Sequence, residues 1–297
     1  MSAWLESLQF VYAPQVVNGL SLGVAVILMA LGLTIIFGLL DVINMAHGEF
    51  YALGAYLGTS LLLTGLSFWI VLVLVPLVML PVGYATERLL IQRVFHHKDR
   101  HILTLLLTFG MAIVLEDVFK LIYGPNSLKP ESPIEGATEL LGMMFPTYRL
   151  FLMGVGLVIV AGVWWVVYRT RLGAIVRAAA YDRHMSASLG VPVLRVYAGT
   201  FAFGVALAGL AGVLLAPVYS VFPTMGKDFI LMAFSVVIVG GLGSIKGAIV
   251  AGLLLTQVQA LSSLYISPVW SDPLVFGIMV LVLMFRPQGL FGRLGHG

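Results

Sequence analysis

The chain has 297 residues, of which 60% are hydrophobic and only 10% are charged, and its mean hydropathy is +1.06. Ordinary soluble domains carry about 25% charged residues, so this composition excludes a soluble protein and predicts one that crosses a membrane several times. The absence of cysteine excludes disulfides and thiolate metal sites. The formal net charge of +3 is small, and the basic residues cluster in short loops that orient membrane helices, so no nucleic-acid partner is predicted.

Nine apolar segments of helical length follow one another along the chain. They span residues 15–39, 46–66, 68–87, 102–123, 149–168, 196–219, 229–243, 247–264 and 273–286. Their length predicts an all-α polytopic membrane protein with about eight to ten transmembrane helices, because β-barrel strands would alternate over about ten residues. Some segments are short for a crossing of about 20 residues, and segments 46–66 and 229–243 are predicted to be broken or re-entrant rather than full spans. Residues 1–297 are predicted to form a single transmembrane domain.

A group of polar residues interrupts the first apolar region. Asp41, Asn44, His47 and Glu49, with Gly48 between the last two, stand in sequence that is otherwise suited to a membrane. A charged residue at the bilayer centre costs about 2.5–3.5 kcal/mol on insertion scales. These side chains therefore either line a route or gate for a polar solute, or form a satisfied polar turn at the membrane surface. The residues alone leave both hypotheses open.

Charges in the connecting loops predict an orientation. Two loops are basic: residues 88–101 contain Arg88, Arg93, Lys98 and Arg100, and residues 169–195 contain Arg169, Arg171, Arg177, Arg183 and Arg195. The positive-inside rule places both loops in the cytoplasm. The connection 124–148 carries three glutamates and is predicted to be external. Counting back from the first basic loop puts the N-terminus outside and residues 41–49 near the cytoplasmic end.

The second basic loop has a pattern of its own. The sequence RTRLGAIVRAAAYDRHMSASLGV is amphipathic and alanine-rich, and Gly173 and Gly190 bound it. It predicts a short helix from Ala178 to Leu189, with Pro192 after its end. A helix in a long cytoplasmic loop suits docking into the groove of a partner protein. The alternative is a plain basic loop that lies on anionic lipid headgroups.

The third distinctive stretch is VGGLGSIKG, residues 239–247. Its glycines, Gly240, Gly241, Gly243 and Gly247, do not form a phosphate-binding loop, because Lys246 is followed by glycine rather than by serine or threonine. They predict a hinge between two short membrane segments, or close packing without a role in transport. Nor does the rest of the sequence supply a catalytic or metal site, since His47-Gly48-Glu49 lacks the second histidine of a zinc-protease motif. No cofactor is predicted on this chain.

A faint internal similarity links the two halves of the chain. Residues 20–25, LSLGVA, resemble residues 201–206, FAFGVA, and residues 48–50 have a looser counterpart at 226–229. Under the predicted topology the two segments run in opposite directions. This pattern predicts an inverted repeat, as in many transporters.

Four blocks in order resemble a known family. GLSLGVAVILMALGLTIIFGLLDVINMAHGEFYALGAY is similar to the opening of LivH-type permeases, the inner-membrane subunits of branched-chain amino acid ABC importers. The basic loop 169–195 resembles the family's coupling segment, residues 234–252 its glycine-rich late segment, and RPQGLFG its C-terminal signature. The resemblance covers essentially the whole chain. Asp41 and the run Val24-Ala25-Val26 depart from the usual pattern, which puts the solute in doubt rather than the class.

The resemblance implies half of a transport pore in the bacterial inner membrane. Such permeases pair with a second, related permease, sit on two ATP-binding cassette subunits and receive an amino acid from a periplasmic solute-binding protein. ATP would then be hydrolysed on another chain. Within the coupling segment, the resemblance points to Gly173, Arg177, Ala178, Asp182 and Gly190. Two alternatives stay open: a urea or short-amide ABC permease, and an ion-coupled secondary transporter that uses Asp41 and Glu49.

Overall fold

The structure is a computed structural model that describes residues 11–95, 97–140 and 142–292. Its helices are α2 (Ala13–Leu40), α3 (His47–Leu63), α4 (Phe68–Thr86) continued by η2 (Glu87–Ile91) and α5 (Gln92–Val94), α6 (Arg100–Tyr123), α7 (Thr147–Arg169), α8 (Arg171–Tyr181), α9 (Arg183–Ser188), α10 (Val193–Tyr219), α11 (Met225–Gly240), α12 (Ile245–Ser262), η3 (Pro268–Trp270) and α13 (Ser271–Phe285). One antiparallel hairpin, β1 (Ala137–Leu140) and β2 (Met143–Pro146), accompanies them. The all-α prediction is confirmed, and each predicted apolar segment corresponds to one helix.

Six of these helices are long and apolar enough to span a membrane, namely α2, α4 with its continuation, α6, α7, α10 and α12. The other apolar helices are shorter. At 1.5 Å per residue, the 17 residues of α3 and the 16 residues of α11 reach only about 24–26 Å. A bilayer core is about 30 Å thick, so neither helix spans it in full, in agreement with the prediction that these segments are not full spans; each is one continuous helix rather than a broken one.

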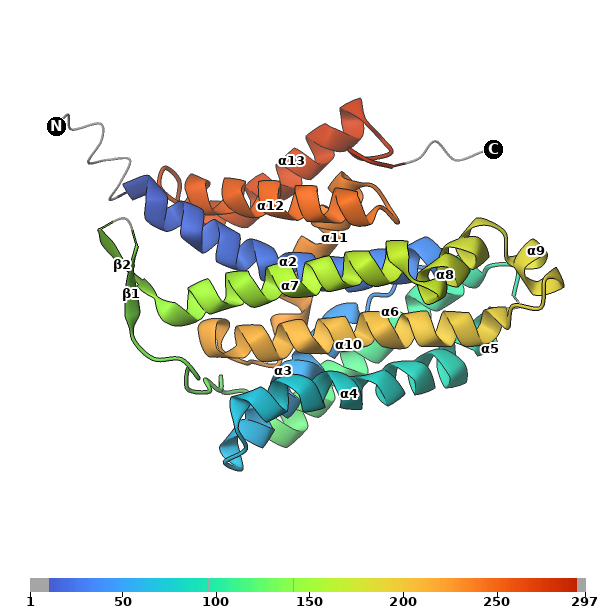
Figure 1. Ribbon diagram of the computed structural model, residues 1–297, viewed down its shortest axis with the longest axis horizontal. Helices are drawn as coiled ribbons and strands as arrows, with labels where there is room; N and C mark the ends of the chain where they lie inside the picture. Colours follow the sequence, from blue (N-terminus) through green and yellow to red (C-terminus); the bar gives the residue numbers. More distant parts are fainter. Residues whose placement is uncertain (1–10, 96, 141, 293–297) are drawn as a thin grey trace.

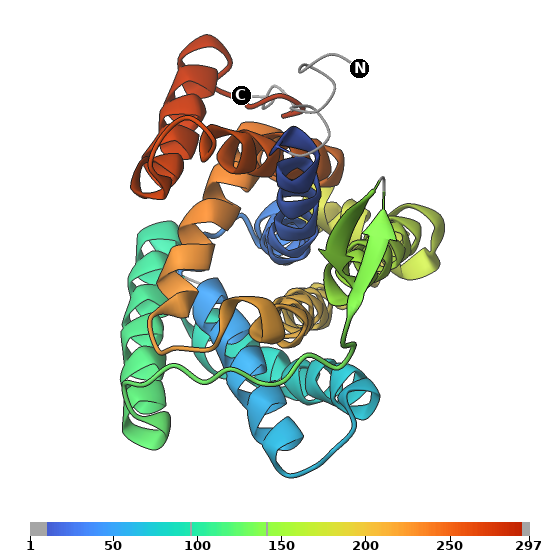
Figure 2. The same cartoon turned by 90° about the vertical axis from the view of Figure 1, so that its left-hand side faces the viewer.

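Two helices form the centre of the molecule. In both α2 and α10, 83% of the most apolar stretch is buried inside the protein, against 17–39% in the other spanning helices. A helix that is apolar on all its faces is found in the core of a large protein or in a membrane. Here protein surrounds α2 and α10. Figure 2 looks along the long axis and shows α7 and α12 beside α2, and α3 and α4 beside α10.

The chain repeats one arrangement in opposite directions. The order long helix, short helix, long helix occurs as α2–α3–α4 and again as α10–α11–α12, and α2 and α10 run antiparallel in Figure 1. The last helix of each half packs against the first helix of the other half: α4 packs against α10, and α12 packs against α2. Among the described residues, the only non-glycine positions with positive φ are Asp41 (53°) and Ser220 (61°), directly after α2 and α10. The arrangement is that of an inverted repeat.

The long axis has two different ends. At one end, the right in Figure 1, lie α5, α8 and α9 with the arginines of both basic loops; we call it the basic end. At the other, the hairpin end, lie β1 and β2. There, Leu128 and Val221 exchange backbone hydrogen bonds of 2.6 and 2.8 Å, which fasten the loop after α6 to the connection between α10 and α11.

Candidate functional site

The connection from α2 to α3 starts at the basic end. The Asp41 carboxylate is 65% exposed and lies 3.9 Å from Arg100 and 3.8 Å from His101. The chain then turns back into the protein, where Asn44 is fully buried and its Oδ1 accepts a hydrogen bond of 3.1 Å from the backbone N–H of Ala46. Asp41 and Asn44 are thus neighbours in sequence that occupy different environments.

The contact made by His47 shows how far the connection between α2 and α3 turns back along α2. Its Nε2 lies 3.1 Å from the carbonyl oxygen of Met29, eleven residues before the end of α2 at Leu40, or about 16 Å along the helix axis. The predicted position of the whole stretch 41–49 near the cytoplasmic end is therefore wrong for its second half. An extended strand of six residues can cover about 20 Å, so the short connection is sufficient to carry α3 to the middle of the protein.

The N-termini of the two short helices meet at this depth. A Cβ atom on Gly48 would overlap the carbonyl oxygen of Gly226, and one on Gly226 would lie 2.5 Å from Oε1 of Glu49. One turn later the rings of Tyr51 and Phe229 are in contact, with their centroids 4.7 Å apart and their planes tilted by 40°. Gly48 has no room for a side chain because backbone meets backbone there, whereas Gly226 lies against the buried carboxylate of Glu49. The glycine pair and the ring pair occupy equivalent positions in the two halves.

A group of charges surrounds this meeting point. Glu116 on α6, whose side chain is 5% exposed, binds Lys120 at 2.7 Å and also Lys227 in the first turn of α11. Glu49 is 1% exposed and interacts electrostatically with Glu116 and with both lysines. The sequence analysis missed this ion cluster, because its members come from three distant segments. The available signal was a carboxylate inside the apolar segment 102–123 that could not stay buried without a partner.

The glycine-rich stretch forms a packed turn between α11 and α12. Gly240 and Gly247 touch backbone to backbone, and Gly243, with φ of 79°, lies against Gly38 of α2. Gly241 has φ of 102°, which favours glycine. The C-terminal segment closes the turn: the N–H of Leu290 donates to Val239 at 2.8 Å, and that of Phe291 to Gly240 at 3.0 Å. Close packing explains each glycine, and a hinge function stays a prediction.

The predicted coupling segment folds as two helices rather than the one helix expected from Ala178 to Leu189. Asp182 separates them: its carboxylate accepts hydrogen bonds from the N–H groups of His184 and Met185 and so caps α9. An aspartate is among the strongest N-cap residues, which explains the break. Gly173 packs against backbone carbonyls at the end of α7, and Gly190 follows α9 with φ of 84°.

The outer surface of this segment carries three large, exposed side chains of mainly apolar character among its charged residues. Tyr181, Met185 and Leu189 are 82%, 61% and 78% exposed, and Ala178 is exposed beside them. Arg177 is used within the chain, since it donates to the carbonyl of Val167 and lies 5.6 Å from the Tyr168 ring. The sequence analysis named Arg177 and Asp182 and missed the three apolar residues. Their signal was large apolar side chains spaced four residues apart in a loop rich in arginine.

A cavity of about 850 Å³ opens between this segment and the ends of α2 and α12. Its charged lining consists of Asp41, Arg100, Arg177, Arg183 and Lys246. Four of these five groups are cationic, so the basic end offers a large, positively lined cavity at the C-terminal end of α2.

Comparison with known proteins identifies the family. The family described as branched-chain amino acid transport system / permease component matches residues 15–283. The chain is 32% identical to the high-affinity branched-chain amino acid transport system permease protein BraD of Pseudomonas aeruginosa, over 95% of this chain and 96% of that protein. It is 33% identical to LivH of Escherichia coli, over 96% and 97%, and 31% identical to LivM of Salmonella typhimurium, over 89% and 67%.

No solved structure matches the chain. The family match covers most of the chain and includes both halves of the inverted repeat, in agreement with the resemblance found in the sequence. The chain is a multi-pass membrane permease that belongs to the branched-chain amino acid transport system permease family.

Proposed function

We propose that this permease forms half of the pore of an ATP-driven importer for branched-chain and other hydrophobic amino acids in the bacterial inner membrane. The observation that supports this most is the similarity, over nearly the full length, to permeases named for branched-chain amino acid transport. ATP would be hydrolysed by two ATP-binding cassette subunits. A periplasmic protein would deliver the amino acid, and a related permease would complete the pore, since this chain is similar to both LivH and LivM.

The meeting point of α3 and α11 is the proposed gate. In this arrangement Asn44, His47, Gly48 and Glu49 lie above the cavity of the basic end, and Asp41 lies on its rim. The helices α3 and α11 begin at mid-depth. Their first N–H groups and the positive ends of their dipoles therefore lie where an amino acid carboxylate would pass. Movement of α11 relative to α3 would open this route. The glycine turn around Gly240, Gly241, Gly243 and Gly247 is the nearest place for such a movement to start.

The segment from Gly173 to Gly190 is the proposed docking site for an ATP-binding subunit. Tyr181, Met185 and Leu189 provide the contact surface, because exposed apolar side chains of this size at a tip mark a protein interface. Asp182 acts by holding α9 in place, and Arg177 by holding α8 against α7. The small side chain of Ala178 adds little bulk beside the three contact residues.

A pair of variants tests the docking site. Met185→Asp should release the ATP-binding subunits in a mild-detergent pull-down, while insertion of the permease in the membrane is unchanged. The matched control is Val269→Asp, which places the same charge on a residue of η3 that is 79% exposed and lies outside the segment from Gly173 to Gly190. Equal recovery of ATP-binding subunits with both variants would contradict the docking site.

The function itself is tested with the assembled transporter in proteoliposomes. Uptake of labelled leucine, isoleucine and valine should require internal ATP and the loaded solute-binding protein. Uptake of urea or acetamide instead would move the proposal to the amide permeases. Uptake driven by an ion gradient, by this chain alone and without ATP, would contradict an ATP-driven importer and turn attention to Asp41 and Glu49 as ion-coupling groups.

A further inference from the structure

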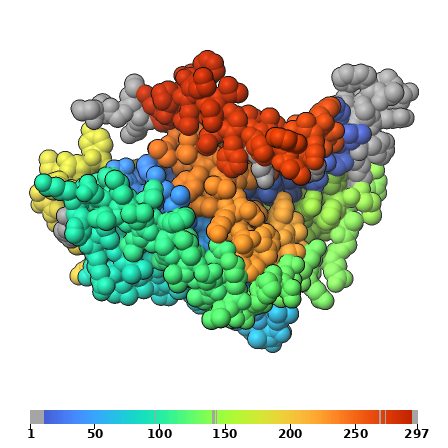
Figure 3. Space-filling model, turned by 180° about the vertical axis from the view of Figure 1, so that it is seen from behind, coloured from blue at the N-terminus to red at the C-terminus, as the bar shows by residue number. Residues whose placement is uncertain are grey.

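Charged side chains gather on one face of the protein at mid-depth. Lys227 follows the glycine at the meeting point of α3 and α11 and pairs with Glu116 of α6. The Lys227 side chain is 53% exposed, and on α6 those of Asp117 and Lys120 are 68% and 45% exposed. Figure 3 looks at this face, where α6 and α11 adjoin. The ion pairs thus lie open on the surface of the subunit.

Lipid is excluded as the cover of this face. A charged group deep in a bilayer is costly and almost always faces a protein interior or water. Two other outward helices show what a lipid-facing surface is in this protein: residues 68–86 of α4 and 150–168 of α7 contain no charged residue. Their exposed side chains are apolar, as at Val73 and Leu157. The face of α6 and α11 therefore meets protein or water in the assembled transporter.

The charges on α6 continue an apolar stripe. Leu106, Phe109 and Ile113 are 57%, 51% and 44% exposed. With Asp117 and Lys120 they recur every three or four residues, so all five lie on one side of the helix. At 1.5 Å per residue the stripe is about 21 Å long, which is enough for a helix of a neighbouring chain to pack along it.

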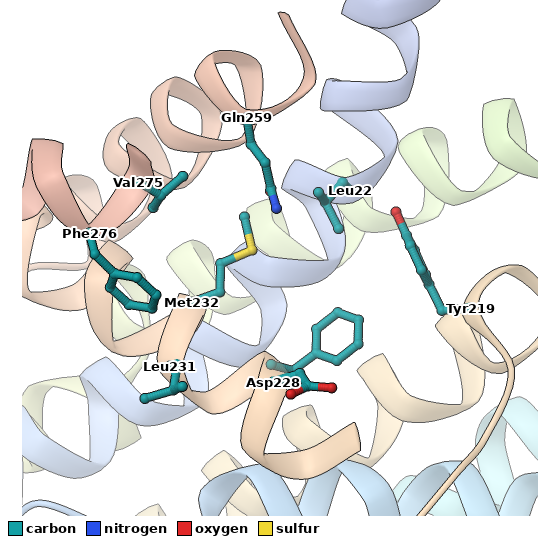
Figure 4. A pocket seen from close by; sticks show the side chains of 9 residues that line it. Leu22, Tyr219, Asp228, Leu231, Met232, Gln259, Val275 and Phe276 are labelled. Atoms are coloured by element: carbon teal, nitrogen blue, oxygen red, sulfur yellow. The ribbon is translucent and has the colours of Figure 1, made fainter. Parts of the chain in front are cut away.

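A pocket limits this surface on the other side of α11. It has a volume of about 220 Å³ and lies between α11, α12 and α13 (Figure 4). Its apolar wall includes Leu231, Met232, Val275 and Phe276. Because the surface is hollowed there, its continuous part consists of the stripe on α6 and the first turn of α11.

We infer that this face binds the related permease that completes the pore, and that a helix of this partner packs along the stripe from Leu106 to Lys120. The inference rests on the proposed function, which requires such a partner. An ATP-binding subunit and a periplasmic protein do not fit, because both lie outside the bilayer. A second copy of this chain fits poorly. A two-fold axis normal to the membrane beside α6 would set Asp117 opposite another Asp117 at equal depth, and like charges across an interface repel.

Photocrosslinking of the assembled transporter, purified with all its subunits in nanodiscs, tests the surface. Phe109→p-benzoylphenylalanine, and the same change at Ile113, should join this chain to the related permease on irradiation, as identified by mass spectrometry of the joined peptides. The matched control is Leu157→p-benzoylphenylalanine on α7, a position that is 65% exposed, where the product with the related permease should be absent.

Three results would overturn the inference. Equal yields from α6 and α7, or products with lipid alone from α6, would show that the related permease does not contact the stripe. A product made only of two copies of this chain would show that the face binds a second copy instead.

A pair of truncations covers the case in which the bulky crosslinker prevents assembly. Leu106→Ala combined with Phe109→Ala removes exposed apolar surface from the stripe, and it should lower the recovery of the related permease in a mild-detergent pull-down. Leu157→Ala combined with Val158→Ala removes similar surface from α7 and should leave recovery unchanged. Equal recovery with both pairs would contradict the contact.

The outcomes separate the surface from the function. If α6 does not crosslink to the related permease while leucine uptake still requires ATP, the surface is overturned and the proposed function stands. If α6 crosslinks to the related permease in a transporter that takes up no amino acid, the surface stands and the proposed substrate fails.

Discussion

The starts of α3 and α11 are equivalent in the repeat but differ in exposure. Both helices begin at mid-depth, after a residue of positive φ, and meet through Gly48 and Gly226. The residue after the glycine in α3, Glu49, is 1% exposed, whereas the two residues after the glycine in α11, Lys227 and Asp228, are exposed. The same backbone arrangement is thus buried at the start of α3 and exposed at the start of α11.

The neighbours of each helix explain the difference. Along α3, Gly54 packs backbone to backbone on Gly209 of α10, and Gly58 packs on Val213. The outer face of α11 remains open between α6 and α13 (Figure 3). Substitutions that crowd the packed face of α3 against α10 should therefore lower stability.

The ion cluster that joins α6 to α11 should give the largest loss of stability. Changing both Lys120 and Lys227 to Met leaves the Glu116 carboxylate, which is 5% exposed, without a cation, and removing one side of such a pair is strongly destabilising. Thermal unfolding followed by fluorescence-detected size exclusion measures the loss.

The cluster also has an internal control. Adding Glu116→Gln to the double variant should restore much of the stability, because it removes the unpaired charge. If the triple variant is no more stable than the double one, the lysines stabilise α11 by contacts other than this carboxylate.

The two glycines at the meeting point of α3 and α11 should differ in the stability that is lost when each is changed to alanine. Gly48→Ala forces a methyl group onto the backbone oxygen of Gly226, which cannot move without shifting α11; the cost should reach about 3 kcal/mol, the upper part of the range for overpacking. Gly226→Ala meets the Glu49 carboxylate at 2.5 Å, which can rotate away, so about 1 kcal/mol is expected. Equal melting temperatures for the two variants would show that the meeting point adjusts equally from both sides.

Most of the fold was predictable from the sequence, because the length and apolarity of a segment are enough to identify a membrane helix. The nine segments, the two short helices and the repeat all depend on properties of one stretch at a time, or on matching two stretches. The depth of His47 was not predictable in this way, because the six residues between α2 and α3 carry no signal of direction. It took the contact with Met29 to show that the chain turns back into the protein.

The site was predictable only in part, for a related reason. Asp41, Asn44 and Glu49 stood out because polar residues are costly in an apolar sequence. Lys227 and Asp228 did not, because they precede the segment 229–243 and resemble ordinary helix-end charges. The role of Lys227 comes from its ion pair with Glu116, which is a contact between distant parts of the chain.

The entry to each short helix offers a smaller test. Asn44 is buried and its side chain accepts from the N–H of Ala46, so Asn44→Ala should cost about 1 kcal/mol, as for a lost hydrogen bond. Thr224 precedes α11, makes no side-chain cap bond and is exposed, so Thr224→Ala should change stability by less than about 0.5 kcal/mol. Chemical denaturation of the purified variants distinguishes these values, and a larger cost at Thr224 would reverse the roles assigned to the two connections.

Effects of similarly small size are expected at the exits of the two central helices, and they differ between the two halves. Asp41 has φ 53° and ψ 41°, the left-handed conformation that aspartate tolerates, whereas Ser220 has φ 61° and ψ 165°, a region that is essentially confined to glycine. Ser220→Gly should therefore relieve strain and raise stability by about 1 kcal/mol. Asp41→Gly should be close to neutral, because it loses only exposed ion pairs worth about 0–1 kcal/mol. A destabilising Ser220→Gly would mean that the backbone bonds between Leu128 and Val221 already hold this turn without strain, so that glycine adds only freedom to the unfolded chain.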